Sequence, residues 1–259
     1  MRIEMLYRYP VKGLSPERLD TAELTAGGYF PGDRLFAIEN GASGFDPAEP
    51  VHQPKIKYLM LMRDEALARL RSRYEDARDE LVIRQDDREV LRAATATEEG
   101  RAAITRFFQG FIPDSLRGVP KLLAAPPAYR FTDSRSGFVS IINLASVADL
   151  EQRIGMAVDP RRFRGNLLVG GLDAWAENDL VGQDLAGPEG LRLHVIKRIE
   201  RCAATNVDPE TGARDRQIPK ALMKTYGHVD CGIYCSVITG GRLVPGSLLT
   251  PVPAEAAST

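Results

Sequence analysis

Short apolar segments separated by turn residues run along most of this chain, and they are what most limits its fold. Turns are marked by dipeptides such as Pro31-Gly32, Asn40-Gly41 and Gly170-Gly171, and Asn-Gly is typical of a β-hairpin. The segments between them are apolar or alternate in the manner of strands. We predict strands at residues 3–9, 35–39, 58–62, 81–83, 138–142, 163–169, 191–199 and 234–239.

Helical spacing of apolar residues is found in fewer places. It predicts helices over residues 64–78, 98–111 and 143–150, with Thr97 as the N-cap of the second. Residues 113–127 contain four prolines and indicate a connection between two halves. We therefore predict a β-rich α+β fold with barrel-like sheets and a few helices, divided into domains at residues 1–115 and 116–255.

Composition excludes several classes of protein. The chain has 259 residues and a net charge of −1, so no global field attracts nucleic acid or an anionic membrane. No apolar run approaches the ~20 residues of a membrane span, and the first residues lack the apolar region of a signal peptide. Three cysteines fit a reduced, cytoplasmic setting and are too few for an all-cysteine iron–sulfur cluster. Electrons for any redox reaction would then come from a partner.

Cys202 is the first candidate for chemistry. It follows Arg201 and precedes the turn-forming run Val207-Asp208-Pro209, which places the sulfur at a strand end near the surface. A neighbouring cation favours the thiolate, which binds a soft metal or carries sulfur. The alternative is a small buried side chain, the usual state of a free cysteine.

Three cations lie next to glycines that let a ligand approach the backbone closely. Lys12 precedes Gly13, Arg34 follows Gly32-Asp33, and Arg164 precedes Gly165. Each cation alone fits a solvated surface charge, and Arg34 has Asp33 as a possible partner. Together, at strand ends, they predict a phosphate cradle.

Two other patterns carry weaker signals. His228, Cys231 and Cys235 partly match the spacing of a zinc site, but a fourth ligand is missing and their alternation favours packing on a strand. Asp208 precedes Pro209, so it is either a turn former or a catalytic acid.

Taken in order, these motifs resemble the MOSC family, named for the C-terminal domain of molybdenum-cofactor sulfurase. The first half resembles its N-terminal β-barrel domain through Tyr9-Pro10-Val11-Lys12-Gly13 and Gly32-Asp33-Arg34. The second half resembles the MOSC domain through Phe163-Arg164-Gly165-Asn166, Arg201-Cys202 and the run from Val207 to Gly212. The similarity covers nearly the whole chain and points to the mitochondrial amidoxime-reducing components and their bacterial relatives.

The resemblance implies a molybdenum cofactor of the molybdopterin type, bound in a cleft between two domains. Cys202 would be the metal ligand and a catalytic residue, with Asp208 as a proton relay. Gly13 and Glu200 stand where some relatives carry serine. The residues implied to bind the cofactor are Lys12, Gly13, Arg34, Ser136, Arg164, Asn166, Arg201 and Thr205.

The implied reaction is reductive removal of oxygen from an N-hydroxylated small molecule in the cytoplasm. Electrons would come from a separate ferredoxin- or flavin-type reductase, and no nucleic acid or membrane would take part. Two alternatives stay open at this point. One is a persulfide carrier or cofactor-handling protein acting through Cys202. The other is a module that binds a small anion in the same cradle without chemistry.

Overall fold

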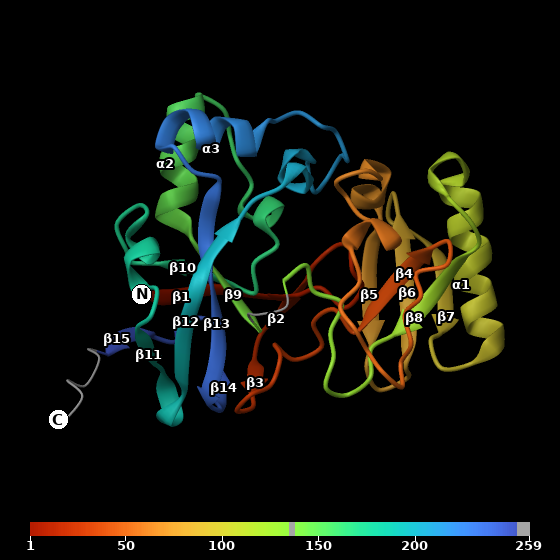
Figure 1. The fold of residues 1–259 in the computed structure, drawn as a ribbon, viewed down its shortest axis with the longest axis horizontal. Coiled ribbons are helices and arrows are strands. Elements are labelled where there is room, and N and C mark those ends of the chain that lie inside the picture. The colour runs from red at the N-terminus through yellow and green to blue at the C-terminus, as the bar shows by residue number, and fades with distance from the viewer. Residues whose placement is uncertain (135–137, 253–259) are drawn as a thin grey trace.

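Two sheet-based units lie side by side in the computed structural model, which describes residues 1–134 and 138–252 (Figure 1). The larger unit is built on an eight-stranded sheet with the order β15-β11-β12-β13-β9-β10-β1-β2. Its strands are β1 (Arg2–Arg8), β2 (Glu17–Leu19), β9 (Val139–Asn143), β10 (Leu167–Gly170), β11 (Asp184–Ala186), β12 (Arg192–Glu200), β13 (Asp230–Thr239) and β15 (Thr250–Val252). A separate pair, β3 (Ala22–Leu24) and β14 (Gly241–Leu243), packs into the same core.

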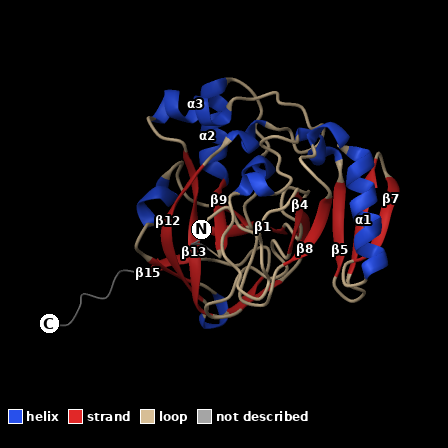
Figure 2. Ribbon diagram, turned by 45° about the vertical axis from the view of Figure 1, so that its right-hand side comes forward, coloured by secondary structure: helices blue, strands red, loops and turns tan. Residues whose placement is uncertain are grey.

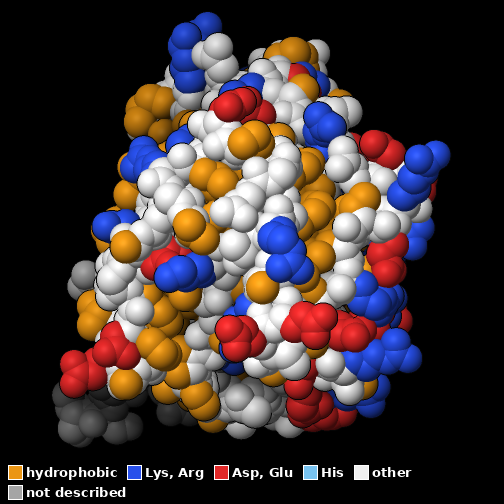
Figure 3. Space-filling view, turned by 90° about the vertical axis from the view of Figure 1, so that its right-hand side faces the viewer, with side chains coloured by type: hydrophobic (Ala, Val, Ile, Leu, Met, Phe, Trp, Pro, Cys, Tyr) orange, Lys and Arg blue, Asp and Glu red, His pale blue; other side chains and the backbone are white. Residues whose placement is uncertain are grey.

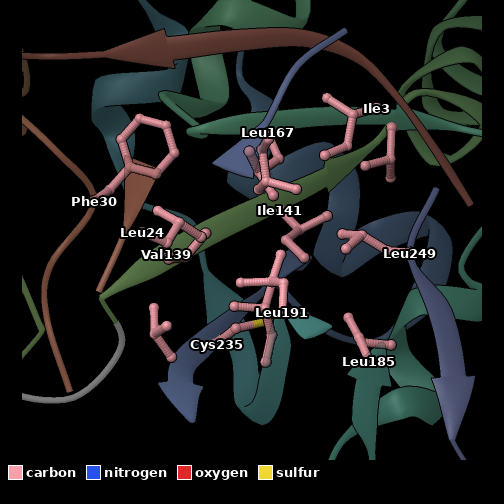
Figure 4. Packing of buried hydrophobic residues seen from close by; sticks show 14 of the residues in the cluster. Ile3, Leu24, Phe30, Val139, Ile141, Leu167, Leu185, Leu191, Cys235 and Leu249 are labelled. Carbon is pink, nitrogen blue, oxygen red and sulfur yellow. The ribbon is translucent and has the colours of Figure 1, made fainter. Parts of the chain in front are cut away.

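The centre of the large sheet is buried on both faces. Ile141 and Ile142 belong to different apolar clusters, as do Leu167 and Leu168, because successive side chains of a strand point to opposite faces. Figure 4 shows the first cluster, which gathers side chains from β1, β9, β10 and β13. The second cluster lies under α2 (Leu144–Ile154) and α3 (Ile218–Tyr226), at the top of Figure 1.

The smaller unit consists of two small sheets and one helix, seen together in Figure 2. Its elements are β4 (Phe36–Asn40) paired with β8 (Pro120–Ala124), the meander β5 (Arg71–Glu75), β6 (Glu80–Gln85) and β7 (Arg88–Ala94), and α1 (Glu98–Phe111). Helix α1 buries Ile104 and Phe108 in the core of this unit. On the unit's outer face, acidic and basic side chains are interspersed (Figure 3).

The chain passes from one unit to the other and back. Strands β1, β2 and β3 lie with the larger unit, residues 36–124 build the smaller unit, and β9 returns to the large sheet. Val11 and Leu14 nevertheless pack in the core of the smaller unit. The division at residues 1–115 and 116–255 stays a prediction.

The predicted β-rich α+β class is confirmed. The helices expected at 98–111 and 143–150 are present as α1 and α2, and Thr97 accepts a hydrogen bond from the Gly100 amide at 3.1 Å, as predicted for the cap. In the part of the chain that the structure describes, the sheets are open rather than closed into a barrel. Within the same residues, no helix has the length and apolar character needed to cross a membrane.

Three local predictions are wrong, and α3 was not predicted. Residues 64–78 form a short 3-10 turn followed by β5. Leu70, Ser72 and Tyr74 are buried alternately along this extended segment, a pattern that the apolar residues alone did not reveal because Ser72 is polar. Asn40-Gly41 closes no hairpin, since β4 pairs with the distant β8. Residues 58–62 contribute an isolated bridge at Tyr58 rather than a strand.

Leu167 is fully buried between β9 and β1, so Leu167→Ala should lower the free energy of unfolding by about 2–5 kcal/mol. The loss combines transfer of the side chain with the cavity that it leaves. Urea unfolding followed by circular dichroism measures it. Leu248→Ala is the matched control, because Leu248 is 61% exposed and its truncation should change stability by less than about 0.5 kcal/mol.

Candidate functional site

A cleft of about 700 Å³ lies where the two units meet. Met60, Leu61 and Met62 of the smaller unit line it, together with residues at the strand ends of the larger unit. The cleft brings together the following predicted site residues: Lys12, Gly13, Arg34, Arg164, Asn166, Arg201, Cys202 and Thr205. Ser136 lies outside the described residues.

Cys202 lies two residues after the end of β12 and is partly exposed in the cleft. Its carbonyl accepts hydrogen bonds from the Thr205 amide at 3.0 Å and the Thr205 hydroxyl at 2.9 Å, which fixes the turn that carries the thiol. Cys231 and Cys235 are fully buried, and burial raises the pKa of Cys231 to about 12. Cys202 is therefore the thiol that meets solvent and ligands.

Arg34 and Arg164 lie against the buried ring of Tyr9. Their guanidinium carbons are 4.7 Å and 4.3 Å from its centroid, which is the geometry of cation–π contacts. Both arginines have left-handed backbones, with φ of +48° and +52°. That conformation costs a non-glycine residue on the order of 1 kcal/mol or more and is concentrated at functional sites.

The two arginines differ in how their charges are balanced. Burial would lower the pKa of Arg34, but Asp33 forms an ion pair with it and the net effect is a raised pKa. Arg164 hydrogen-bonds the Leu14 carbonyl at 2.7 Å and forms no ion pair with a described acidic side chain. Burial, together with the charge of Arg34, lowers the pKa of Arg164 to about 10.

Arg201 is a second partly buried cation, and its hydrogen bonds within the described part of the chain go to carbonyls. It donates to the Cys231 carbonyl at 2.7 Å and the Phe163 carbonyl at 2.8 Å, and its guanidinium carbon lies 5.4 Å from the Phe163 ring. Burial lowers its pKa. Since its hydrogen bonds go to neutral carbonyls, none of them neutralises the charge.

Lys12 and Gly13 also line the cleft. Lys12 is 7% exposed, donates to the Phe131 carbonyl at 3.0 Å and pairs with Asp133, whose pKa falls to about 2. Burial lowers the pKa of Lys12 itself. Gly13 has φ of +83°, and a Cβ there would lie 2.9 Å from the Leu59 carbonyl oxygen, so the position requires glycine.

Positive charge is concentrated in this cleft although the chain as a whole has a net charge of −1. Its described lining contains three acidic residues, Asp33, Asp133 and Glu200. It contains eight basic residues: Lys12, Arg34, Lys55, Arg162, Arg164, Lys197, Arg198 and Arg201. Partly buried cations without a described counter-ion, such as Arg164 and Arg201, are costly, so the arrangement favours an anionic ligand.

Asn166 and Thr205 line the cleft but have structural partners. The Asn166 side-chain oxygen accepts from the Ser140 amide at 3.1 Å and hydroxyl at 2.8 Å, and its nitrogen donates to the Tyr7 carbonyl at 3.2 Å. Asn166 therefore ties β9 to β1. The Thr205 hydroxyl donates to Cys202, as described above.

Asp208 is not among the residues that line the cleft. Its carboxylate accepts from the Glu210 and Thr211 amides at 2.9 Å and 2.8 Å, and it pairs with the buried Arg162 at 2.8 Å. Burial opposes these contacts, but together they lower its pKa. The geometry is that of a turn anchor, the first of the two interpretations drawn from the sequence.

Sequence reasoning did not identify Tyr234, Lys197, Arg198 and His52 as lining residues. Tyr234 follows the core residue Ile233 on β13, so the two side chains point to opposite faces of the sheet. The alternation of an apolar residue with a tyrosine could have indicated that Tyr234 faces away from the core. Burial raises its pKa, while Arg201 and Arg34 oppose the rise.

Cys231 and Cys235 lie in different core clusters, because Gly232, at φ +84°, interrupts the alternation of side chains along β13.

Because the thiols of Cys231 and Cys235 are buried, we predict that one cysteine per chain reacts with a chromogenic disulfide reagent at pH 8 under native conditions. All three should react in denaturant. Cys202→Ser should abolish the native signal, and Cys235→Ser should leave it unchanged. A second fast-reacting thiol in the native protein would contradict the burial described here.

Arg164→Met should remove stabilisation of the protein by phosphate. A ligand that binds only the folded state raises stability by RT ln(1 + [L]/Kd), so the midpoint of thermal unfolding should rise with phosphate in the wild type. The variant should show less than about one third of that rise. Arg18→Met, at an exposed position of β2, is the control and should retain it. An equal rise in the Arg164→Met variant would exclude this arginine from the anion site.

Comparison with known proteins gives two family models that match the chain in succession. The MOSC N-terminal beta barrel domain matches residues 1–112, and the MOSC domain matches residues 128–250. Among solved structures, the YuaD protein from Bacillus subtilis is 14% identical with a TM-score of 0.45, covering 96% of this chain and 93% of that one. YiiM from Geobacillus stearothermophilus is 20% identical with a TM-score of 0.37, covering 47% and 57%.

The curated relatives match over shorter segments. Human mitochondrial amidoxime-reducing component 1 is 36% identical over 90 residues, which are 35% of this chain and 26% of that protein. Mitochondrial amidoxime reducing component 2 of Bos taurus is 35% identical over 120 residues, 42% and 35% of the two chains. Molybdenum cofactor sulfurase of Caenorhabditis elegans is 35% identical over 97 residues, 35% and 13%. The match thus spans about a third of these relatives or less, while the two family models confirm the resemblance over both halves: the chain belongs to the MOSC-domain family.

Proposed function

We propose that the protein binds a molybdopterin-type molybdenum cofactor in the cleft and reduces N-hydroxylated small molecules with electrons from a separate protein. One observation carries the proposal. Two partly buried arginines that pair with no carboxylate among the described residues, Arg164 and Arg201, line the same cleft as the partly exposed thiol of Cys202. An anionic ligand with a thiophilic centre would satisfy both features.

The residues present fit such a cofactor. A cleft of about 700 Å³ is within the usual range for cofactor sites, roughly 300–1,000 Å³. Arg164, Arg34 and Lys12 would hold the phosphate and pterin, and Gly13 leaves the backbone accessible beside them. Cys202 would supply the protein thiolate to the metal, and Arg201 would lie beside it as a fixed positive charge. Ser136 belongs to the proposed set as well.

The chain's own contribution is to bind, orient and balance charge. When bound, the cofactor supplies two-electron redox chemistry. Reduction of an N–OH group consumes two electrons and two protons and yields an N–H group and water. The arginines keep their charge at neutral pH, so they provide electrostatic stabilisation rather than protons. Asp208 anchors the turn after Cys202 and thereby fixes the thiol.

A second candidate, a sulfur carrier, rests on the accessibility of Cys202. Its sulfur is partly exposed beside Arg201, which would also suit a persulfide. One of the relatives is named molybdenum cofactor sulfurase. The two functions differ in what Cys202 carries when the protein is isolated.

The test combines metal analysis, intact mass and turnover. We expect purified protein from a molybdate-supplied host to contain about one molybdenum per chain, and Cys202→Ser to contain less than about a tenth of that, since the metal loses its protein ligand. Loaded protein with a reductase chain should convert benzamidoxime to benzamidine. Loaded protein without turnover would contradict the reductase. An added sulfur atom on Cys202 that reductant removes would favour the carrier.

A further inference from the structure

The segment after Cys202 crosses from the larger unit to the smaller one. We name residues 207–215 the bridging turn. Asp208 closes it by accepting from the Glu210 and Thr211 amides, and the Gly212 amide donates to the Asp208 carbonyl at 3.0 Å. The closed turn packs on residues 65–69, where a Cβ at Gly212 would come within 2.9 Å of the Glu65 carbonyl oxygen.

Arg214 connects the bridging turn to the wall of the cleft by hydrogen bonds. Its Nη2 donates to the Leu61 carbonyl at 3.1 Å and the Met62 carbonyl at 2.8 Å, and it pairs with Glu65 at 2.9 Å. Leu61 and Met62 both line the cleft that contains Cys202. A side chain from the larger unit thus holds the cleft-lining backbone of the smaller one.

Arg71 makes the reciprocal connection. Its guanidinium, on β5 of the smaller unit, donates to the Pro209 and Glu210 carbonyls, each at 3.1 Å, and pairs with the Glu210 carboxylate. Hydrogen bonds from a charged donor are stronger than neutral ones. The exposed ion pairs of Arg71 with Glu210 and of Arg214 with Glu65 contribute less to stability than the hydrogen bonds, and salt weakens them by screening.

The base of the turn is tied to the thiol. Arg162 is 4% exposed, pairs with Asp208 and Asp215, each at 2.8 Å, and donates to the Asn206 carbonyl at 3.2 Å. Residues 203–206 form a 3-10 turn that begins at Cys202. A movement of the bridging turn away from the smaller unit would therefore change the space around Cys202.

We propose that Arg71 and Arg214 are positioning residues that latch the bridging turn across the two units and so limit the size of molecule that reaches Cys202. The latch does not depend on the chemistry at the thiol. It holds for a cofactor site and for a sulfur carrier alike. Opening would require the carbonyl bonds of both arginines to break together.

The test measures the labelling of Cys202 by a small and a bulky reagent, iodoacetamide and a maleimide attached to polyethylene glycol. In the double variant Arg71→Gln/Arg214→Gln, we expect the bulky reagent to react at least about tenfold faster than in the wild type. The reason is that the charge-assisted hydrogen bonds from both arginines to backbone carbonyls are lost. Iodoacetamide should react less than about threefold faster, since Cys202 is already partly exposed.

Arg92→Gln is the matched control. Arg92 is an arginine of similar exposure whose ion pairs, to Glu75, Glu80 and Glu89, stay within the smaller unit, so neither rate should change. Raising the salt concentration should speed bulky labelling of the wild type but not of the double variant. Equal changes for both reagents, or no change, would overturn the latch. If circular dichroism shows that the double variant is unfolded, the same labelling is measured on Glu65→Gln, which removes the ion pair with Arg214. The bulky reagent should then react faster by a smaller factor, and iodoacetamide should react at an unchanged rate.

Discussion

The site depends on keeping positive charge partly buried where no carboxylate of the described residues neutralises it. Arg164 and Arg201 lose water on burial and receive only neutral carbonyls and aromatic faces in return. Such a cation destabilises the protein without a ligand, and a bound anion offsets that cost. The lowered pKa of both groups records that cost, and the left-handed backbone of Arg164 adds strain. The rest of the structure has to hold these side chains in place.

Topology explains where they are held. Lys12 and Gly13 lie in a segment that leaves β1 and packs its neighbours Val11 and Leu14 into the smaller unit. Arg34 lies where the chain enters that unit before β4, and Asp133 lies where it returns before β9. Lys12, Gly13 and Arg34 therefore lie in segments that connect the two units, where the two cores meet and a cleft forms between them.

Sequence predicted the parts of this arrangement that are local. Thr97, α1 and the buried β9 follow from capping and periodicity. The three cations beside glycines line one cleft, and their role as a phosphate cradle stays a prediction. Pairing of β4 with β8 was not predictable, since eighty residues separate them and Asn40-Gly41 signals a closer partner. Leu70 and Tyr74 are four residues apart, a spacing that fits one face of either a helix or a strand, and tertiary packing decided between the two.

A residue that lines a cleft need not bind what the cleft holds. Asn166 has both oxygen acceptors and one amide hydrogen engaged with Ser140 and Tyr7, so its replacement would loosen β9 from β1. Lys12 follows β1, and Arg164 precedes β10, which pairs with both strands, so any effect of the replacement on ligand binding would pass through them. Lost activity at Asn166 is therefore weaker evidence of ligand contact than lost activity at Arg164, whose charge pairs with no carboxylate of the described residues.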